Sequence, residues 1–350
     1  MKQIFVVISV LTSVCIVLPA VLVMLFSDSR AATDLAVDHV AEDQEERAEE
    51  EEVGKEEVEE VFVPVYRDAS ETVQEVELEQ YVAGVVASEM PASFEMEALK
   101  AQALVARTFV VKQMENEESI QLPEGALVTD TTSHQVYHST EELQELWGSD
   151  YDEKMERIQK AVHATKGEVI THEGTPITAS FFSTSNGYTE NAEDYWANEL
   201  PYLKSVESPW DQNNSPRFTN TVRIPVSDAE AKLGVSIPAT EEFAPITERT
   251  EGGRVQEVTI SGETFHGREI REALGLDSSD FSWHREADEL VVSTKGWGHG
   301  VGMSQYGADG MAKSGNSYEE IVAHYYQEIQ IENHHSQLEQ YALNTVEEDE

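Results

Sequence analysis

Glycine occupies every second position from Gly296 to Gly302, within the segment KGWGHGVGMSQYGADGMA at residues 295–312. Glycine loses more backbone entropy on folding than any other residue, so such a run needs a packing or binding reason. The alternation matches the two-residue period of a β-strand, which would place all four glycines on one bare face and His299 on the other. Two interpretations remain open. Either another element of the protein packs on the bare face, or a flat ligand such as a sugar ring lies on the backbone.

The same segment lacks the motifs of nucleotide-binding proteins and serine hydrolases. A dinucleotide-binding loop has the pattern GxGxxG, whereas glycine simply alternates here. A nucleophile elbow has the pattern GxSxG, and Tyr306 stands where its last glycine would be. The sequence also contains no GxxxxGK[ST] phosphate-binding loop. These mismatches weaken both functions.

The amino-terminal sequence predicts a membrane anchor. Residues 4–26 form an uncharged apolar stretch of 23 residues, long enough to cross a bilayer, and no clean signal-peptidase site follows. We therefore expect residues 1–30 to be a single-pass anchor, with a weak bias from Lys2 toward a cytoplasmic start. The single cysteine, Cys15, lies in this stretch, so the expected outer domain has no disulfide and no thiol chemistry.

Acidic residues dominate the rest of the chain. Residues 42–60 hold twelve acidic and two basic side chains, and a like-charge run of this kind stays solvated. We expect residues 31–60 to be a flexible linker and residues 336–350 to be an acidic tail. The formal net charge of −45 argues against nucleic-acid binding, which requires a basic surface.

The pattern of helix and strand signals predicts an α+β fold. Strands and helices are mixed without a regular βαβ rhythm, so antiparallel strands are expected. We predict one domain over residues 61–335, with a β-rich subdomain at 205–290. The expected helices cover residues 78–88, 93–112, 151–165 and 267–274, together with short helices after capping-box pairs at Ser227/Glu230 and Ser317/Glu320. The expected strands cover residues 61–66, 168–172, 176–183, 245–250 and 254–260.

Glu89, in the segment ASEMP, is a candidate general acid. It stands at the predicted end of a helix, just before Pro91, among apolar neighbours. Burial and the negative end of a helix dipole both disfavour the carboxylate and raise its pKa. A carboxyl group that stays protonated near neutral pH can act as a general acid. The alternative is a surface glutamate, since the chain has 68 acidic residues.

Basic residues are scarce, so their positions are informative. Lys100 and Arg107 stand seven residues apart on one face of a predicted buried helix, and Lys204 adjoins another unusual segment. These cations could bind an anionic group of a substrate. They could equally form ion pairs with some of the many carboxylates.

Two further segments suggest polar sites. His134 and His138 lack an obvious third ligand, so no metal site is predicted. In SFFSTSNGYTENAEDYW, residues 180–196, a strand ends in hydroxyl and amide side chains that include Ser185, and aromatic residues follow as far as Tyr202. Such a mixture lines carbohydrate sites, although it is also common in ordinary turns.

Four segments together resemble one family. The segments YVAGVVASEMPASFEMEALKAQALVARTF, FFSTSNGYTENAEDYW, YLKSVESPWD and GWGHGVGMSQYGA look like those of stage II sporulation protein D. The likeness runs from about residue 60 to residue 330, and the amino-terminal anchor agrees with it. This family comprises membrane-anchored lytic transglycosylases that act during engulfment in endospore-forming bacteria.

The resemblance implies a reaction and a setting. Such enzymes cleave the bond between N-acetylmuramic acid and N-acetylglucosamine in peptidoglycan strands whose stem peptides have been removed, and they leave 1,6-anhydro ends. It also implies a sporulation amidase or endopeptidase and a membrane scaffold protein as partners. The location would be the mother-cell membrane, with the carboxy-terminal domain outside, facing the intermembrane space. No cofactor is expected. Some relatives carry zinc through a histidine and cysteines near the position of His134, but this chain lacks those cysteines.

The resemblance also assigns residues. The glutamate of the ASEMP segment, here Glu89, would be the catalytic acid. The glycine segment would then form the bare wall of a glycan groove. The expected substrate-binding residues are Lys100, Arg107, Ser185, Tyr202, Lys204, His299, Gln305 and Tyr306.

Two other functions remain as alternatives. A hydrolytic muramidase would pair Glu89 with Asp194 or Asp130, because hydrolysing glycosidases use two carboxylates. A non-catalytic scaffold would bind the cell wall and recruit an amidase. The apolar setting of an intact Glu89 counts against the scaffold.

Overall fold

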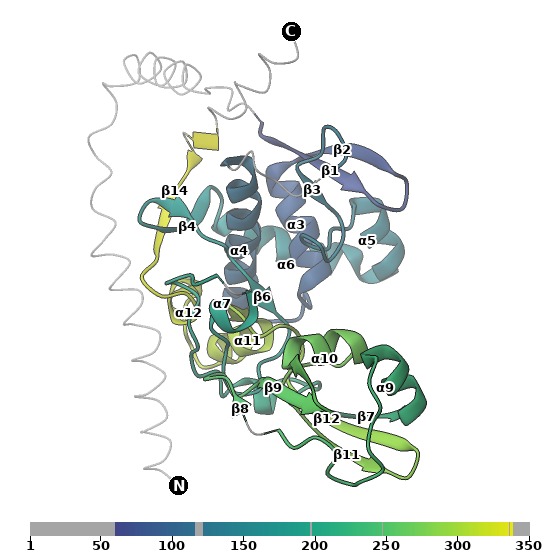
Figure 1. Cartoon of the computed structure of the whole chain (residues 1–350). Coiled ribbons are helices and arrows are strands. Elements are labelled where there is room, and N and C mark those ends of the chain that lie inside the picture. Colours follow the sequence, from purple (N-terminus) through teal and green to yellow (C-terminus); the bar gives the residue numbers. More distant parts are fainter. Residues whose placement is uncertain (1–59, 116–121, 197, 247, 336, 339–350) are drawn as a thin grey trace, which may run out of the picture. The chain divides into compact units, whose positions relative to one another are not determined.

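The computed structural model describes residues 60–115, 122–196, 198–246, 248–335 and 337–338 (Figure 1). The predicted anchor, nearly all of the linker and most of the acidic tail lie outside these residues. Within the described part, no helix is both long and apolar enough to span a bilayer. Helices and strands are mixed along the chain, and most strand pairs are antiparallel, so the α+β prediction is confirmed.

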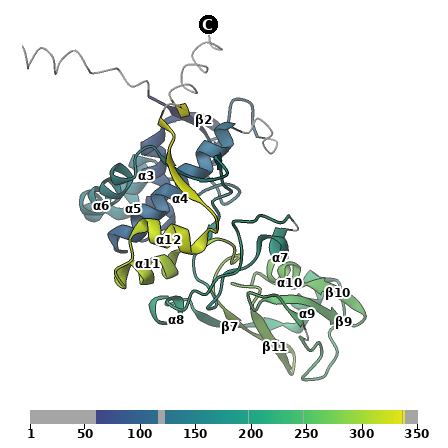
Figure 2. The ribbon, with the colours of Figure 1, turned by 90° about the vertical axis from the view of Figure 1, so that its left-hand side faces the viewer.

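The first part of the fold is helical and is built around one buried helix. The helices of this part are α3 (Leu78–Glu89), α4 (Met96–Glu115), α5 (Thr140–Trp147), α6 (Tyr151–Ala164), α11 (Gln305–Lys313) and α12 (Tyr318–Tyr325). Helix α4 contacts α3, α6, α11 and α12 (Figure 2). It is apolar on nearly all sides, as a fully surrounded helix must be. The late helices α11 and α12 thus pack on the helix that follows the one ending at Glu89.

Two small sheets border this helical part. Their strands are β1 (Phe62–Arg67), β2 (Thr72–Glu77), β3 (Val128–Thr129), β4 (Glu168–His172), β5 (Thr175–Pro176) and β14 (Gln330–Asn333). The sheet orders are β2-β1-β3 and β14-β4-β5. The predicted turn between β4 and β5 is present, and both of its central residues, Glu173 and Gly174, have positive φ. That geometry suits a two-residue hairpin.

The second part of the fold has its own core and two three-stranded sheets. Its elements are β7 (Thr219–Pro225), α9 (Val226–Leu233), β8 (Glu248–Arg249), β9 (Val255–Ile260), β10 (Glu263–His266), α10 (Gly267–Leu274), β11 (Phe281–Glu286) and β12 (Glu289–Lys295). The sheet orders are β10-β9-β8 and β11-β12-β7. A core of buried side chains lies between residues 226 and 292. This core overlaps the predicted subdomain and extends two residues past its predicted end, because β12 also supplies Val292.

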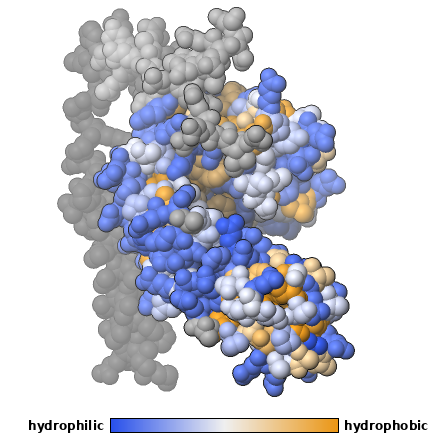
Figure 3. Space-filling view, in the orientation of Figure 1, coloured by the Kyte–Doolittle hydropathy of each residue, from blue (hydrophilic) through white to orange (hydrophobic). Residues whose placement is uncertain are grey.

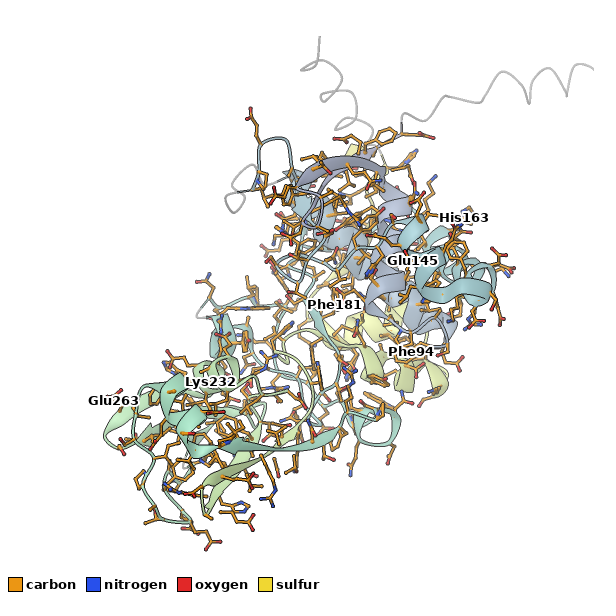
Figure 4. The ribbon with its side chains drawn as sticks, turned by 90° about the vertical axis from the view of Figure 1, so that its right-hand side faces the viewer. Phe94, Glu145, His163, Phe181, Lys232 and Glu263 are labelled. Atoms are coloured by element: carbon orange, nitrogen blue, oxygen red, sulfur yellow. The ribbon has the colours of Figure 1, made fainter. Side chains whose placement is uncertain are left out.

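Short elements join the two parts. They are α7 (Ala192–Trp196), α8 (Asp211–Asn214), and the parallel pair β6 (Phe181–Phe182) and β13 (Met303–Ser304). Figure 4 shows Phe181 in the middle of the molecule, between the part that carries Glu145 and His163 and the part that carries Lys232 and Glu263.

Of the two capping boxes predicted from the sequence, one is present and one is not. The capping box of Ser317 and Glu320 is confirmed at the start of α12. The one predicted at Ser227 is wrong, because α9 begins at Val226 and the Glu230 carboxylate accepts a hydrogen bond from the Ile237 N–H instead.

Candidate active site

The glycine segment is not a strand, which corrects the sequence prediction. The φ angles of Gly296, Gly298, Gly300 and Gly302 are +79°, +110°, +91° and +80°, in the region that favours glycine. Residues 296–302 therefore form a series of turns between β12 and β13. The alternation marks a repeated backbone geometry rather than one bare face of a sheet.

Each of these glycines packs against the protein itself. A Cβ on Gly296 would lie 2.8 Å from the Thr184 carbonyl oxygen, and one on Gly298 would lie 2.9 Å from the Phe182 Cβ. At Gly300 and Gly302 it would overlap the Arg254 guanidinium and the Ser180 carbonyl oxygen. The interpretation as the wall of a glycan groove is therefore wrong, and internal packing holds.

The packing fixes the segment onto residues 180–186. Trp297 exchanges two backbone hydrogen bonds with Thr184, of 2.7 and 3.0 Å. Six residues later, β13 begins, pairs with β6 and leads directly into α11, where Ser304 caps the helix. The glycine segment thus sets the position of the first residues of α11.

A cleft with a volume of about 630 Å³ opens at the end of α3. Residues from six separate stretches of the chain line it, namely residues 87–93, Trp147, Lys154, Ser183, Pro216, Arg217, Gln305 and Tyr306. Three of the four segments quoted for the family resemblance contribute to it. Glu89 is the only carboxylate among the lining residues.

Glu89 is the last residue of α3 and is partly buried. Burial raises the pKa of its carboxyl group, while a hydrogen bond of 2.9 Å from the Val136 N–H to Oε1 opposes the rise. The net direction is upward, as expected from its neighbours. The protonated form, which a general acid needs, is favoured.

Gln305 and Tyr306 lie in the cleft beside Glu89. The Gln305 amide donates to the Glu89 carbonyl oxygen at 3.0 Å and to Gln102 at 3.4 Å. The Tyr306 ring packs edge-on against Phe94, with 5.0 Å between ring centroids. The structure therefore brings these two predicted residues together with Glu89.

Arg107 is a buried ion-pair partner, and its expected contact with substrate is wrong. Its side chain has no exposed surface, and its guanidinium forms a double contact with Glu79 of 2.9 and 2.6 Å. Further donors reach Thr165 and the carbonyl oxygens of Val162 and Glu168. No N–H remains for a ligand, so the ion-pair alternative holds.

The two predicted lysines are also paired and lie outside the lining of the cleft. Lys100 binds Glu97 at 2.7 Å and lies over the Tyr318 ring. Lys204 binds Glu193 and Glu199 at 2.6 and 3.0 Å. The sequence analysis expected both lysines to contact the substrate, but the structure places neither of them in the lining of the cleft.

Three other predicted residues have packing roles. Tyr202 is buried, and its hydroxyl accepts from the Thr178 N–H at 3.1 Å. Ser185 is buried and donates to the Ser208 carbonyl oxygen. His299 lies against Phe182, Tyr195 and Trp196, and burial lowers its pKa to about 4, so it stays neutral. None of the three lines the cleft.

The second carboxylates of the muramidase alternative lie elsewhere too. Asp130 pairs with Arg67 at 3.2 Å, and Asp194 accepts from Asn191 at 2.9 Å. Neither lines the cleft with Glu89. In the described part of the chain, no group of three histidine, cysteine or acidic side chains could hold a metal ion. His138 instead lies 2.7 Å from the Ser88 hydroxyl, measured from its Nδ1.

The sequence analysis missed the two cations that do line the cleft, Lys154 and Arg217. Each lies over a tryptophan ring. The Lys154 ammonium is 5.4 Å from the centroid of Trp147, and the Arg217 guanidinium carbon is 4.3 Å from that of Trp297. The scarcity of basic residues was the signal available, but sequence spacing could not show which cations share a cleft.

Comparisons with known proteins show which proteins this chain resembles. A family model described as "SpoIID: Stage II sporulation protein" matches residues 66–172, which contain Glu89. Stage II sporulation protein D of Bacillus subtilis is 46% identical over 332 residues, covering 95% of this chain and 96% of that protein. The protein of the same name from Bacillus amyloliquefaciens is 50% identical over 281 residues, covering 80% and 81%. An "Amidase enhancer" of Bacillus subtilis is 28% identical over 296 residues, covering 69% of this chain and 39% of that protein.

Proposed function

The chain belongs to the stage II sporulation protein D family, and from this premise we propose that it is a peptidoglycan lytic transglycosylase with Glu89 as its catalytic acid and base. The substrate is a glycan strand stripped of stem peptides, cleaved between N-acetylmuramic acid and N-acetylglucosamine. One observation carries the proposal: among the described residues, a partly buried carboxyl group of raised pKa, that of Glu89, is the only carboxylate lining the cleft.

The reaction follows from a single carboxyl group. Protonated Glu89 donates its proton to the glycosidic oxygen, and the bond from that oxygen to the muramic acid anomeric carbon breaks. The 6-hydroxyl oxygen of the same sugar bonds to the anomeric carbon, and its proton passes to the Glu89 carboxylate. The products are a free N-acetylglucosamine 4-hydroxyl and a 1,6-anhydromuramic acid end, and Glu89 is again protonated.

A hydrolysing glycosidase needs a second carboxylate beside the catalytic acid. Its second carboxylate stands about 5–10 Å from the acid and either attacks the sugar or activates water. Among the described residues that line the cleft, no second carboxylate is present. Attack by the sugar's own hydroxyl removes that requirement, so this arrangement favours a transglycosylase over a muramidase.

The proposed reaction also implies partner proteins and a location. The substrate needs a prior amidase or endopeptidase, which would act as a partner together with a membrane scaffold protein. Residues 1–30 would anchor the chain in the mother-cell membrane, supported by the uncharged apolar stretch at 4–26. The domain would then face the intermembrane space. The likeness to a protein named an amidase enhancer favours the coupling to an amidase.

Product analysis tests the reaction directly. Mass spectrometry of digested peptide-free strands should show 1,6-anhydro ends, which are one water lighter than hydrolysed reducing ends. Glu89→Gln should lower their formation by at least about a hundredfold, the usual contribution of a positioned acid or base. Reducing ends from the wild type would establish a muramidase, and undiminished activity of Glu89→Gln would remove Glu89 from the mechanism. Binding of strands without any cleavage would favour the scaffold.

A further inference from the structure

The Arg217 side chain is held in a fixed place in the cleft. Its guanidinium carbon lies 4.3 Å from the centroid of the Trp297 ring. The Arg217 backbone N–H donates to the Ser215 hydroxyl at 3.1 Å, and that hydroxyl lies 2.7 Å from the Thr184 hydroxyl. Thr184 also holds the Trp297 backbone through two hydrogen bonds. One residue therefore positions both members of the stack.

Arg217 differs from every other arginine that the structure describes. Nine of the ten described arginines donate guanidinium hydrogen bonds to protein oxygens, and these are Arg67, Arg107, Arg157, Arg223, Arg249, Arg254, Arg268, Arg271 and Arg285. Within the described residues, Arg217 makes no such bond, although it lies in a cleft with Glu89. The whole chain has 68 acidic and 23 basic residues, about three carboxylates for each cation, so a guanidinium that donates to no oxygen of the described residues stands out here.

Stacking on the Trp297 ring leaves the N–H groups at the edge of the Arg217 guanidinium available to a ligand. A guanidinium that lies over an aromatic ring presents its N–H groups at its edge, where they match both oxygens of a carboxylate. Lys154, the other cation of the cleft, is less available because Asp150 lies 3.4 Å from its ammonium group. Arg217 is therefore the cation of this cleft that is better placed to meet an anionic group.

We infer that Arg217, stacked on Trp297, binds the lactyl carboxylate of a muramic acid unit and so selects strands without stem peptides. This inference rests on the proposed function, because it names the recognised group of that substrate. A free lactyl carboxylate exists only after the peptide has been removed; with the peptide attached, the same carbon is a neutral amide. A charge-assisted bond is roughly twice as strong as a neutral one, so the amide binds less tightly.

A binding experiment isolates this contact from catalysis. Full-length protein carrying Glu89→Gln is titrated with peptide-free strands and with the same strands whose lactyl carboxylates have been converted to methylamides. We expect the free carboxylates to bind about tenfold more tightly, which corresponds to about 1.4 kcal/mol. Adding Arg217→Gln should remove this preference and leave binding of the methylamide strands within about twofold. High salt should reduce the preference, because the guanidinium is exposed to solvent.

Two variants serve as controls. Arg268 also lies over an aromatic ring, at 4.7 Å from the centroid of Tyr195, but outside the cleft. Arg268→Gln should retain the tenfold preference. Arg217→Lys should give an intermediate value, because the charge remains and the two-pronged geometry is lost.

The outcomes separate this inference from the proposed function. A preference that survives Arg217→Gln in a protein of unchanged melting temperature would overturn the inference, and so would an equal loss in Arg268→Gln. The nature of the product ends, measured on the protein with intact Glu89, decides the reaction type independently of this ratio.

Discussion

The side-chain amide of Gln305 donates a hydrogen bond of 3.0 Å to the backbone carbonyl oxygen of Glu89. This bond joins the first residue of α11 to the last residue of α3, although 216 positions separate them in the sequence. Gln305 stands immediately after β13, whose position depends on the packed glycine segment. The glycines thus affect the position of Glu89 indirectly, because they help to place Gln305, which bonds to the end of its helix.

The first prediction concerns the stability of the Glu89→Gln variant. Burial raises the pKa of Glu89 in the folded state, so its ionisation destabilises the fold. The stability that depends on this proton is complete below the unfolded-state pKa, about 4.3, and is lost as the pH rises through the folded-state pKa. Glu89→Gln removes the titration and keeps an acceptor for the Val136 N–H. Its free energy of unfolding relative to wild type should therefore increase between pH 4 and pH 8.

Urea unfolding at both pH values measures this difference. Glu145→Gln, at an exposed position, controls for the removal of one carboxylate from a chain of net charge −45. An equal change in the two variants would mean that general charge repulsion, rather than the site of Glu89, is responsible.

The second prediction concerns Arg107, whose role is structural. Breaking a buried ion pair leaves an unpaired charge, so Arg107→Ala should lower the free energy of unfolding by about 3–5 kcal/mol. Any activity lost should be lost equally on peptide-free and intact strands. The double variant Arg107→Met with Glu79→Met should recover much of the stability, because no unpaired charge then remains. Chemical denaturation of the three proteins checks this, and a double variant less stable than Arg107→Ala would contradict it.

Local features of the fold were predictable because their causes lie close together in the sequence. The helix containing Glu89 was predicted at residues 78–88 and spans Leu78–Glu89, and the helix at 267–274 was predicted with its observed bounds. The raised pKa of Glu89 followed from its apolar neighbours and its place at a helix end. Each of these inferences used fewer than twenty consecutive residues.

Contacts between distant residues could not be predicted, because spacing along the sequence does not show which residues meet in the fold. Arg107 finds Glu79 from 28 residues away, and no spacing rule selects one partner among 68 acidic residues. The stack of Arg217 on Trp297 likewise joins segments about 80 residues apart. The alternating glycines matched a strand period, but period alone does not reveal positive φ. Those angles arise from packing against residues 180–186 and Arg254, which only the folded chain supplies.

The third prediction concerns Asp211, which accepts hydrogen bonds from three buried serines. Its carboxylate accepts from the Ser185 N–H at 2.8 Å and from the hydroxyls of Ser208 and Ser304 at 2.6 and 2.5 Å. Asp211→Ala would leave these buried donors without a partner, at about 1–3 kcal/mol for each unsatisfied group. We expect a loss of at least about 3 kcal/mol in stability. Lys160→Ala, at an ion pair with Glu156 in which both side chains are exposed, should cost less than about 1 kcal/mol.

Hydrophilic residues cover much of the face drawn in Figure 3, in keeping with the acidic composition. Exposed charges of this kind contribute little individually to stability. In the glycine segment, by contrast, close packing against neighbouring atoms should decide how far a substitution lowers stability.

Gly302→Ala and Gly174→Ala form a matched pair for this test. Their φ angles are +80° and +78°, so the backbone strain of placing alanine there, about 1–2 kcal/mol, is the same. They differ in surroundings. No atom lies within 4 Å of a Cβ on Gly174, whereas one on Gly302 would overlap the Ser180 carbonyl oxygen, which accepts from the Met303 N–H and the Tyr326 hydroxyl. Gly302→Ala must therefore separate β13 from β6 as well as adopt a strained φ. Its loss of stability should exceed that of Gly174→Ala by at least about 2 kcal/mol, comparable to the overpacking of a core. Because Gln305 follows β13 directly, glycan cleavage should also fall in Gly302→Ala and remain near wild type in Gly174→Ala, both measured below the melting temperature. Equal losses in the two variants would show that positive φ alone, rather than close packing, explains the alternating glycines.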